Sequence, residues 1–219
     1  MLSGINRQHS HHGGRATSGG IAMAEQKIGK LNLTDILVTI VASLVFGLIF
    51  RLMGPVYDLL KPFGLQLEML TYGIWFIAGP FVALLIRKPG VAFLAETAAA
   101  AVELLFAGSG GIINVYYGLI QGVFSEAVFA AFLYKRFTLL TAILSGVAAS
   151  IGSFILDIPY GYLTGLVGWN LTLNIVFRFI SAIILAGFLP YILVKALEKT
   201  GVTQLVRPVT KEDYDVLKK

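Results

Sequence analysis

The stretch "VAFLAETAAAAVELLFAG", residues 91–108, has the apolarity and length of a membrane-spanning helix, yet it contains Glu96 and Glu103. A charged carboxylate near the centre of a membrane helix costs about 2.5–3.5 kcal/mol on insertion scales. Two carboxylates on one helix therefore need a compensating role, either in holding helices together or in binding a ligand. The stretch indicates a membrane protein with a polar interior.

The composition of the whole chain supports this interpretation. Of its 219 residues, 57% are hydrophobic and 13% are charged, against about 25% charged in ordinary soluble domains. The chain has no cysteine, and its three histidines all precede residue 13, so neither a thiolate metal site nor catalysis by histidine is expected. The net charge of +5 comes from basic residues in small groups between apolar runs, a distribution typical of membrane topology and not of nucleic-acid binding.

Apolar runs of about 20 residues predict an all-α integral membrane protein with a bundle of six transmembrane helices. The runs are continuous and do not alternate, which argues against a β-barrel. The connection "RKPG" at 87–90 is short, so the second and third helices should form an antiparallel hairpin. The predicted spans are 34–53, 69–87, 90–107, 113–133, 138–157 and 170–194.

Three parts of the chain are predicted from composition. Residues 1–22 lack periodicity and the apolar core of a signal peptide, so we interpret them as a disordered leader or tag. Residues 23–200 would form the six-helix domain and residues 201–219 a cytoplasmic tail. Basic residues at the span ends predict that both termini are cytoplasmic. The segments expected outside are 54–68, 108–112 and 158–169, and the last is suited to cover an outward-facing cavity as a lid.

Polar residues within the spans fall into two layers. A helix rises about 1.5 Å per residue, which places Glu96 about 10 Å and Glu103 about 21 Å from the cytoplasmic end of the third span. Glu126 of the fourth span joins Glu96 in the inner layer, where we favour a role in helix packing or in coupling. The outer layer consists of Glu103, Gln121, Asn174 and Arg178, with Trp75 nearby.

Helical spacing aligns the outer polar residues into stripes that must turn away from lipid. Asn114, Tyr117, Gln121 and Ser125 share one stripe, and Asn170, Asn174 and Arg178 share another. If the third, fourth and sixth helices surround a common space, it suits a small, planar, polar molecule. The predicted ligand contacts are Trp75, Glu103, Tyr117, Gln121, Asn170, Asn174 and Arg178. In the alternative interpretation, Glu103 and Arg178 only neutralise each other.

Other features of the sequence argue for binding over catalysis. The chain has no P-loop, HExxH motif or nucleophile elbow, so neither an enzyme nor a cofactor is expected. Asp157, just before Pro159, is expected to end the fifth helix and shape the outer loop. Small residues such as Gly118 and Gly122 predict close helix packing. On the first helix they allow an alternative, a face that docks a partner subunit.

Three segments carry a resemblance to a known family. They are "GIWFIAGPFVALLIRKPGVAFLAETAAAAVE" at 73–103, "GLIQGVFSEAVFA" at 118–130 and "YKR" at 134–136. They resemble the YkoE-type S components, the substrate-binding subunits of energy-coupling-factor (ECF) vitamin transporters associated with thiamine or its hydroxymethylpyrimidine precursor. The resemblance covers most of residues 33–200 and is specific in its long second-to-third-helix block.

The resemblance implies a protein of the bacterial plasma membrane that captures a vitamin at the outer face. It also implies partners, namely a transmembrane coupling subunit and two ATPase subunits that supply energy. Ala42, Ser43 and Gly47 of the first helix would then be the docking face. Two alternatives stay open: an S component for another vitamin, and a membrane scaffold or enzyme whose glutamates only hold helices together.

Overall fold

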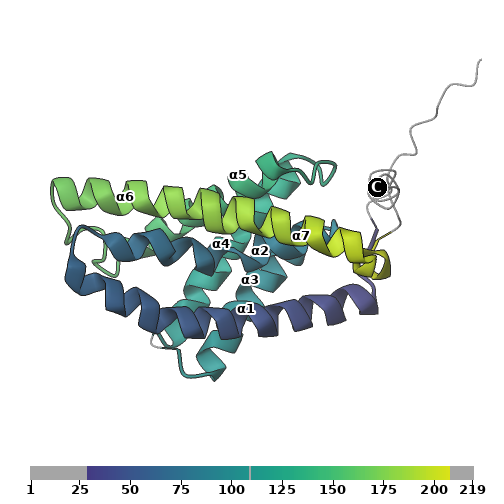
Figure 1. Ribbon diagram of the computed structural model, residues 1–219, viewed down its shortest axis with the longest axis horizontal. Helices are drawn as coiled ribbons and strands as arrows, with labels where there is room; N and C mark the ends of the chain where they lie inside the picture. Colours follow the sequence, from purple (N-terminus) through teal and green to yellow (C-terminus); the bar gives the residue numbers. More distant parts are fainter. Residues whose placement is uncertain (1–28, 109, 208–219) are drawn as a thin grey trace, which may run out of the picture.

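The computed structural model describes residues 29–108 and 110–207, and all regular structure in these ranges is helical (Figure 1). The predicted leader at 1–22 and the tail from residue 208 onward lie outside the described residues. The α-helices are α1 Leu33–Leu60, α2 Ala78–Ile86, α3 Val91–Leu105, α4 Ile112–Ala131, α5 Leu139–Asp157, α6 Trp169–Ser181 and α7 Leu189–Thr200. The shorter or tighter helices are η1 Lys61–Phe63, η2 Leu67–Phe76 and η4 Val202–Leu205, all 3₁₀, and the π-helix η3 Ala182–Phe188.

The all-helical membrane fold predicted from the apolar runs is confirmed, with two irregular spans. The second span consists of η2 followed by α2, and the sixth of α6, η3 and α7 in continuous succession. Within the described ranges, five helical segments are long and apolar enough to cross a membrane. The 15-residue α3 is not among them, because about 22 Å of helix is shorter than the ~30 Å hydrocarbon core. Six full spans therefore stay a prediction.

Helices α2 and α3 form the expected antiparallel hairpin. The N–H of Gly79, near the start of α2, donates to Oε2 of Glu96 in α3 at 2.7 Å. The turn between the helices begins at Arg87 and ends at Gly90, with φ angles of +59° and +86°. Glycine adopts such left-handed angles without steric cost, so the "RKPG" sequence permits this short connection.

Both glutamates of the predicted inner layer bind backbone groups at the start of a helix. The first N–H groups of a helix have no intrahelical partner, and the helix dipole favours a negative charge there. Glu96 meets this need for α2. Glu126 does so for α3, accepting from the N–H groups of Gly90 at 2.6 Å, Ala92 at 2.9 Å and Phe93 at 3.2 Å. These contacts give both carboxylates a structural role.

Small residues allow α3 and α4 to pack closely, as the sequence predicts. A Cβ built on Gly118 would lie 2.5 Å from the Cβ of Ala100. One on Gly122 would lie 3.0 Å from the backbone oxygen of Phe93. No side chain larger than hydrogen fits at either position without a shift of α3.

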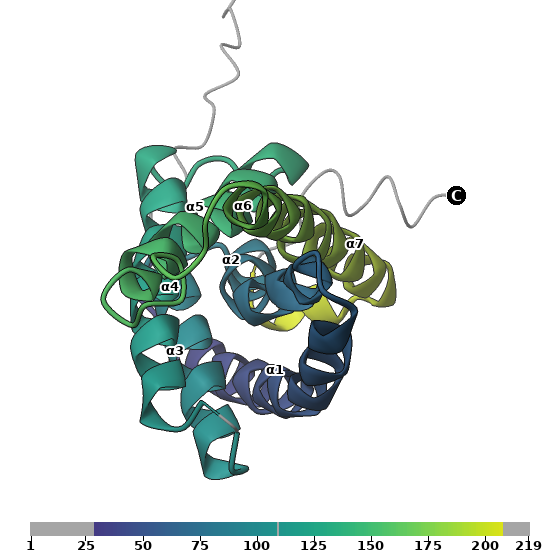
Figure 2. The same cartoon turned by 90° about the vertical axis from the view of Figure 1, so that its left-hand side faces the viewer.

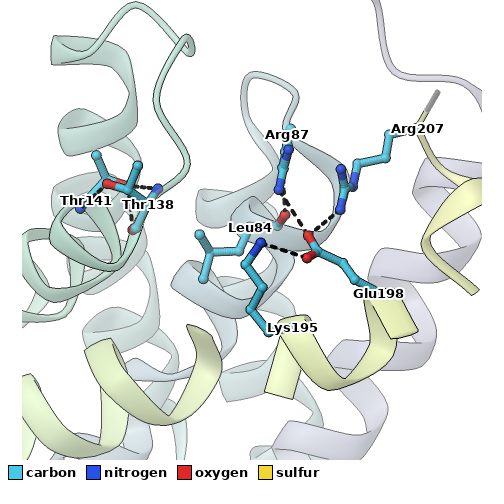
Figure 3. A network of polar contacts seen from close by, with 7 residues as sticks. All are labelled: Leu84, Arg87, Thr138, Thr141, Lys195, Glu198 and Arg207. Carbon is cyan, nitrogen blue, oxygen red and sulfur yellow. Dashed lines mark hydrogen bonds and ion pairs between the residues drawn. The ribbon is translucent and has the colours of Figure 1, made fainter. Parts of the chain in front are cut away.

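The start of α1 and the end of α7 lie at the same end of the molecule, on the right in Figure 1. At this end the carboxylate of Glu198, whose side chain is 3% exposed, contacts three basic side chains (Figure 3). Arg87 donates to it at 3.0 Å and Lys195 lies at 2.8 Å, while Arg207 reaches it from beyond α7. Glu198 therefore joins α7 to the α2–α3 turn and to the segment after η4.

Two further contacts consolidate this end of the molecule. Lys88 in the α2–α3 turn pairs with the buried Asp35 of α1 at 2.5 Å. Val206 is 5% exposed and belongs to the largest hydrophobic cluster, around α2. The first residues of the predicted tail, 201–207, thus pack against the bundle.

Candidate functional site

A cavity of about 570 Å³ lies within the half of the bundle that is remote from the start of α1 and the end of α7 (Figure 1). Its walls come from the end of α1, η1, η2, α3, the start of α4, the end of α5 and α6. Figure 2 faces this end of the molecule, with the 158–168 connection running between α5 and α6. The volume lies within the usual range of about 300–1,000 Å³ for sites that bind small molecules. Its aromatic lining residues are Phe50, Tyr57, Tyr72, Trp75, Tyr117 and Tyr162.

Six of the seven predicted ligand contacts line this one cavity, and these are Trp75, Glu103, Tyr117, Gln121, Asn174 and Arg178. The seventh, Asn170, is exposed and outside the cavity lining. Asn170 lies in the first turn of α6, which begins at Trp169. The polar stripe of α6 that lines the cavity therefore begins at Asn174, one helical turn later than predicted.

Glu103 and Trp75 form a direct pair at the cavity wall. The indole Nε1 of Trp75 donates to Oε1 of Glu103 at 3.1 Å. Oε2 of Glu103 is buried and has no hydrogen-bond partner among the described residues. A buried carboxyl oxygen without a donor is costly, so this atom can readily accept a hydrogen bond from a bound molecule.

Arg178 has a different carboxylate partner from the one the sequence offered. It forms an ion pair with Asp157 at the end of α5, and its Nη1 also donates to Ser153 Oγ at 3.1 Å. The hydroxyl of Tyr117 donates to the other carboxyl oxygen of Asp157 at 2.5 Å. Arg178 is therefore not the counter-ion of Glu103. Asp157 ends α5 as expected, but it is also a buried part of the cavity wall, which the sequence interpretation missed.

Aromatic rings fix the position of the guanidinium group and continue around the cavity. Arg178 lies over the rings of Tyr72 and Phe154, at 4.2 and 4.6 Å from their centroids. The ring of Tyr72 is 5.8 Å from that of Trp75, which meets Tyr57 edge-on at 5.9 Å. Such packed rings form a rigid wall suited to stacking against a planar or cationic ligand.

Comparison with known proteins identifies the family. Residues 34–152 match the family described as "ABC-type cobalt transport system, permease component". The chain is 36% identical over 170 residues to YkoE of Bacillus subtilis (strain 168), named as an HMP/thiamine permease, covering 77% of this chain and 85% of that one. The chain belongs to the YkoE family of ECF S components. It also matches the crystal structure of an S component of an ECF transporter with a TM-score of 0.76 and 33% identity, covering 80% of this chain and 89% of the other. It is therefore a multi-pass protein of the plasma membrane.

In this S component, the predicted outer segment 54–68 contributes more to the cavity than its sequence indicated. It supplies Tyr57, Asp58, Lys61, Gln66 and Glu68 to the lining, in part because α1 continues to Leu60. The sequence of a connection does not show whether its polar residues face solvent or a cavity. Only a contact with a distant segment shows that, and here Nδ2 of Asn174 in α6 donates to Oε1 of Gln66 at 3.0 Å.

The connection between α5 and α6 also reaches the cavity. Tyr162 and Leu166 belong to its lining, and the N–H of Tyr162 donates to the carbonyl oxygen of Asp157 at 3.0 Å. The connection is thus tied to the residue that holds Arg178. Its action as a lid stays a prediction.

The proposed docking residues of α1 face the interior of this S component. Ser43 Oγ donates to the carbonyl oxygen of Ala95 at 3.2 Å, and a Cβ on Gly47 would lie 2.5 Å from Val102. Ala42 is half-buried and packs against the core. Docking through Ser43 and Gly47 would require α3 to move aside, and this role stays a prediction. The exposed apolar residues of α1 include Leu37, Ile40, Val41, Leu44, Val45, Leu48 and Leu52.

Proposed function

We propose that this S component captures thiamine or its hydroxymethylpyrimidine precursor at the outer face of the membrane. The observation that carries the proposal is the Trp75–Glu103 pair, which offers an unpartnered, buried carboxyl oxygen to a cavity with aromatic walls. The relative named as an HMP/thiamine permease supports the same ligand class.

The chemistry of an aminopyrimidine is complementary to these residues. Its exocyclic amine can donate to Glu103, while its ring nitrogens can accept from amide groups. Gln121 and Asn174 place side-chain amides in the same lining. The thiazolium ring of thiamine adds a positive charge, which aromatic faces and a carboxylate both stabilise.

Uptake requires an energy source that separate subunits would supply. We assign ATP hydrolysis to two ATPase subunits and its transmission to a transmembrane coupling subunit, as in ECF transporters. The sequence supports this division of labour because it lacks the P-loop with which P-loop ATPases hold nucleotide phosphates. With cytoplasmic termini, the cavity would face outward.

Isothermal titration of the full chain in detergent, without ATP, tests ligand capture. We expect saturable binding of thiamine or hydroxymethylpyrimidine, weakened at least about tenfold, or ~1.4 kcal/mol, by Glu103→Gln and by Trp75→Ala. Asn174→Ala and Asn170→Ala form a matched pair: the first should weaken binding, while the second, outside the cavity, should not.

Two outcomes would change the proposal in different ways. Absence of heat with both ligands, from protein that still melts cooperatively, would overturn the substrate assignment. Mass spectrometry of ligand retained through purification gives the second measurement. Recovery of a different vitamin would preserve the role as binding subunit and replace the substrate.

A further inference from the structure

The charged residues that line the cavity are unevenly paired. Lys61 pairs with Asp58 at 2.8 Å on the exposed rim, and Arg178 pairs with Asp157 in the interior. Both basic side chains of the lining therefore already have an acidic partner. The lining contains two further acidic residues, which leaves it with more acidic than basic side chains.

These two residues are Glu68 and Glu103, and each has a buried oxygen without a donor. Glu68 is 8% exposed and Glu103 is 3% exposed. In each, Oε2 is buried and lacks a hydrogen-bond partner among the described residues. They come from different elements, η2 and α3, so the cavity presents two separate unsatisfied carboxyl groups. Buried polar groups are almost always satisfied in native structures, which makes a ligand the natural source of the missing donors.

We propose that Glu68 is a second anchor beside Glu103, and that the two make the site selective for a cationic ligand and exclude its phosphate esters. The inference rests on the proposed function and specifies which form of the vitamin this site accepts. It adds to that function a specificity residue that the sequence patterns do not reveal.

Charge explains both the preference for a cationic ligand and the exclusion of its phosphate esters. A cation near Glu68 gains attraction from the carboxylate and from the face of a neighbouring aromatic residue such as Tyr57, which lines the same cavity. A phosphate group carries a charge of about −1.5 to −2 at neutral pH. It would meet two carboxyl groups that have no basic partner in the lining, while Lys61 and Arg178 are committed to acidic partners.

Competition binding on the full chain in detergent tests the inference with thiamine, thiamine monophosphate and hydroxymethylpyrimidine as probes. Wild-type protein should bind thiamine at least about tenfold more tightly than the monophosphate. Glu68→Gln should reduce that ratio at least about threefold, mainly by weakening thiamine. Hydroxymethylpyrimidine, which lacks the thiazolium charge, should lose less affinity than thiamine.

Glu126→Gln provides the control, because it removes one carboxylate at a position outside the cavity lining. The Glu126 carboxylate binds backbone N–H groups at the start of α3, so the ratio should change by less than about twofold. An equal effect of both variants would show that net charge alone determines selectivity, and would overturn the specific role of Glu68.

The remaining outcomes separate this inference from the proposed function. If none of the three probes binds to folded wild-type protein, both fail. If thiamine binds but wild-type protein accepts the monophosphate equally well, or Glu68→Gln leaves the ratio unchanged, only this inference fails. The wild-type ratio requires no variant, so a failure of Glu68→Gln to fold would not prevent a decision.

Discussion

Replacement of Glu126 by alanine tests whether the inner glutamates stabilise helices and do not bind ligand. The change removes acceptors at 2.6, 2.9 and 3.2 Å from three N–H groups at the start of α3. A hydrogen bond contributes about 1 kcal/mol net, and loss of a helix cap costs about 0.5–2 kcal/mol. Because Glu126 is half-buried, water replaces part of the loss, and we expect a net cost of about 2–3 kcal/mol.

The assay combines thermal unfolding with binding. For a chain of this size, about 2–4 °C of Tm accompanies each kcal/mol, so Tm should fall by about 4–12 °C. Intrinsic tryptophan fluorescence in detergent measures Tm, and titration well below Tm measures thiamine affinity, which should change by less than about twofold because Glu126 is outside the cavity lining.

Two variants serve as controls for this prediction. Glu126→Gln retains one acceptor oxygen and should lose about half as much stability. Glu103→Gln should show the reverse pattern, with weaker binding and little change in Tm. A Tm for Glu126→Ala within about 1 °C of wild type would refute the capping argument, as would a loss of affinity equal to that of Glu103→Gln.

Asp157→Asn should destabilise the protein by about 3–5 kcal/mol by leaving the charge of Arg178 without its partner, whereas the double change Asp157→Leu with Arg178→Met should cost less than the sum of the single changes. Urea or thermal unfolding of Asp157→Asn, of the two single changes Asp157→Leu and Arg178→Met, and of their combination measures this. Gly73→Ala should lower Tm by more than about 5 °C, because a Cβ there would lie 2.3 Å from the carbonyl oxygen of Ser181; a normal Tm would contradict the close contact of η2 with α6. Glu198→Gln should cost about 1–3 kcal/mol because three basic side chains contact that carboxylate. Thermal unfolding with and without added salt should give nearly the same difference in Tm from wild type, because the Glu198 side chain is 3% exposed and salt screens buried pairs weakly.

The local sequence predicted the helical architecture because the membrane leaves the backbone few options. A chain in lipid must satisfy its own N–H and C=O groups, so long apolar runs such as 34–53 and 113–133 can be assigned to helices without knowledge of their neighbours. The 3.6-residue period likewise placed Tyr117 and Gln121 on one face, and both line the cavity. Helix length was harder to predict, since α1 continues to Leu60 beyond the apolar run.

The roles of individual buried charges depended on partner residues that are distant in the sequence. Depth along α3 separated Glu96 from Glu103, but only the contact with Gly79 shows that Glu96 caps α2. Depth offered Glu103 as a partner of Arg178, but the end of α5 brings Asp157 to it instead. Periodicity describes the faces of one helix and does not choose between neighbours.

The sequence by itself determined that this is a helical membrane protein with a polar interior, that α2 and α3 form a hairpin, and that Glu103 is near Trp75. The tertiary structure alone showed that Asn170 lies outside the cavity, that Ser43 and Gly47 face α3, and that Glu68 faces the cavity. The physical reason is that hydropathy and helical period are properties of a local segment. The partner of a buried charge depends on which segments pack together, and that choice is made by the whole fold.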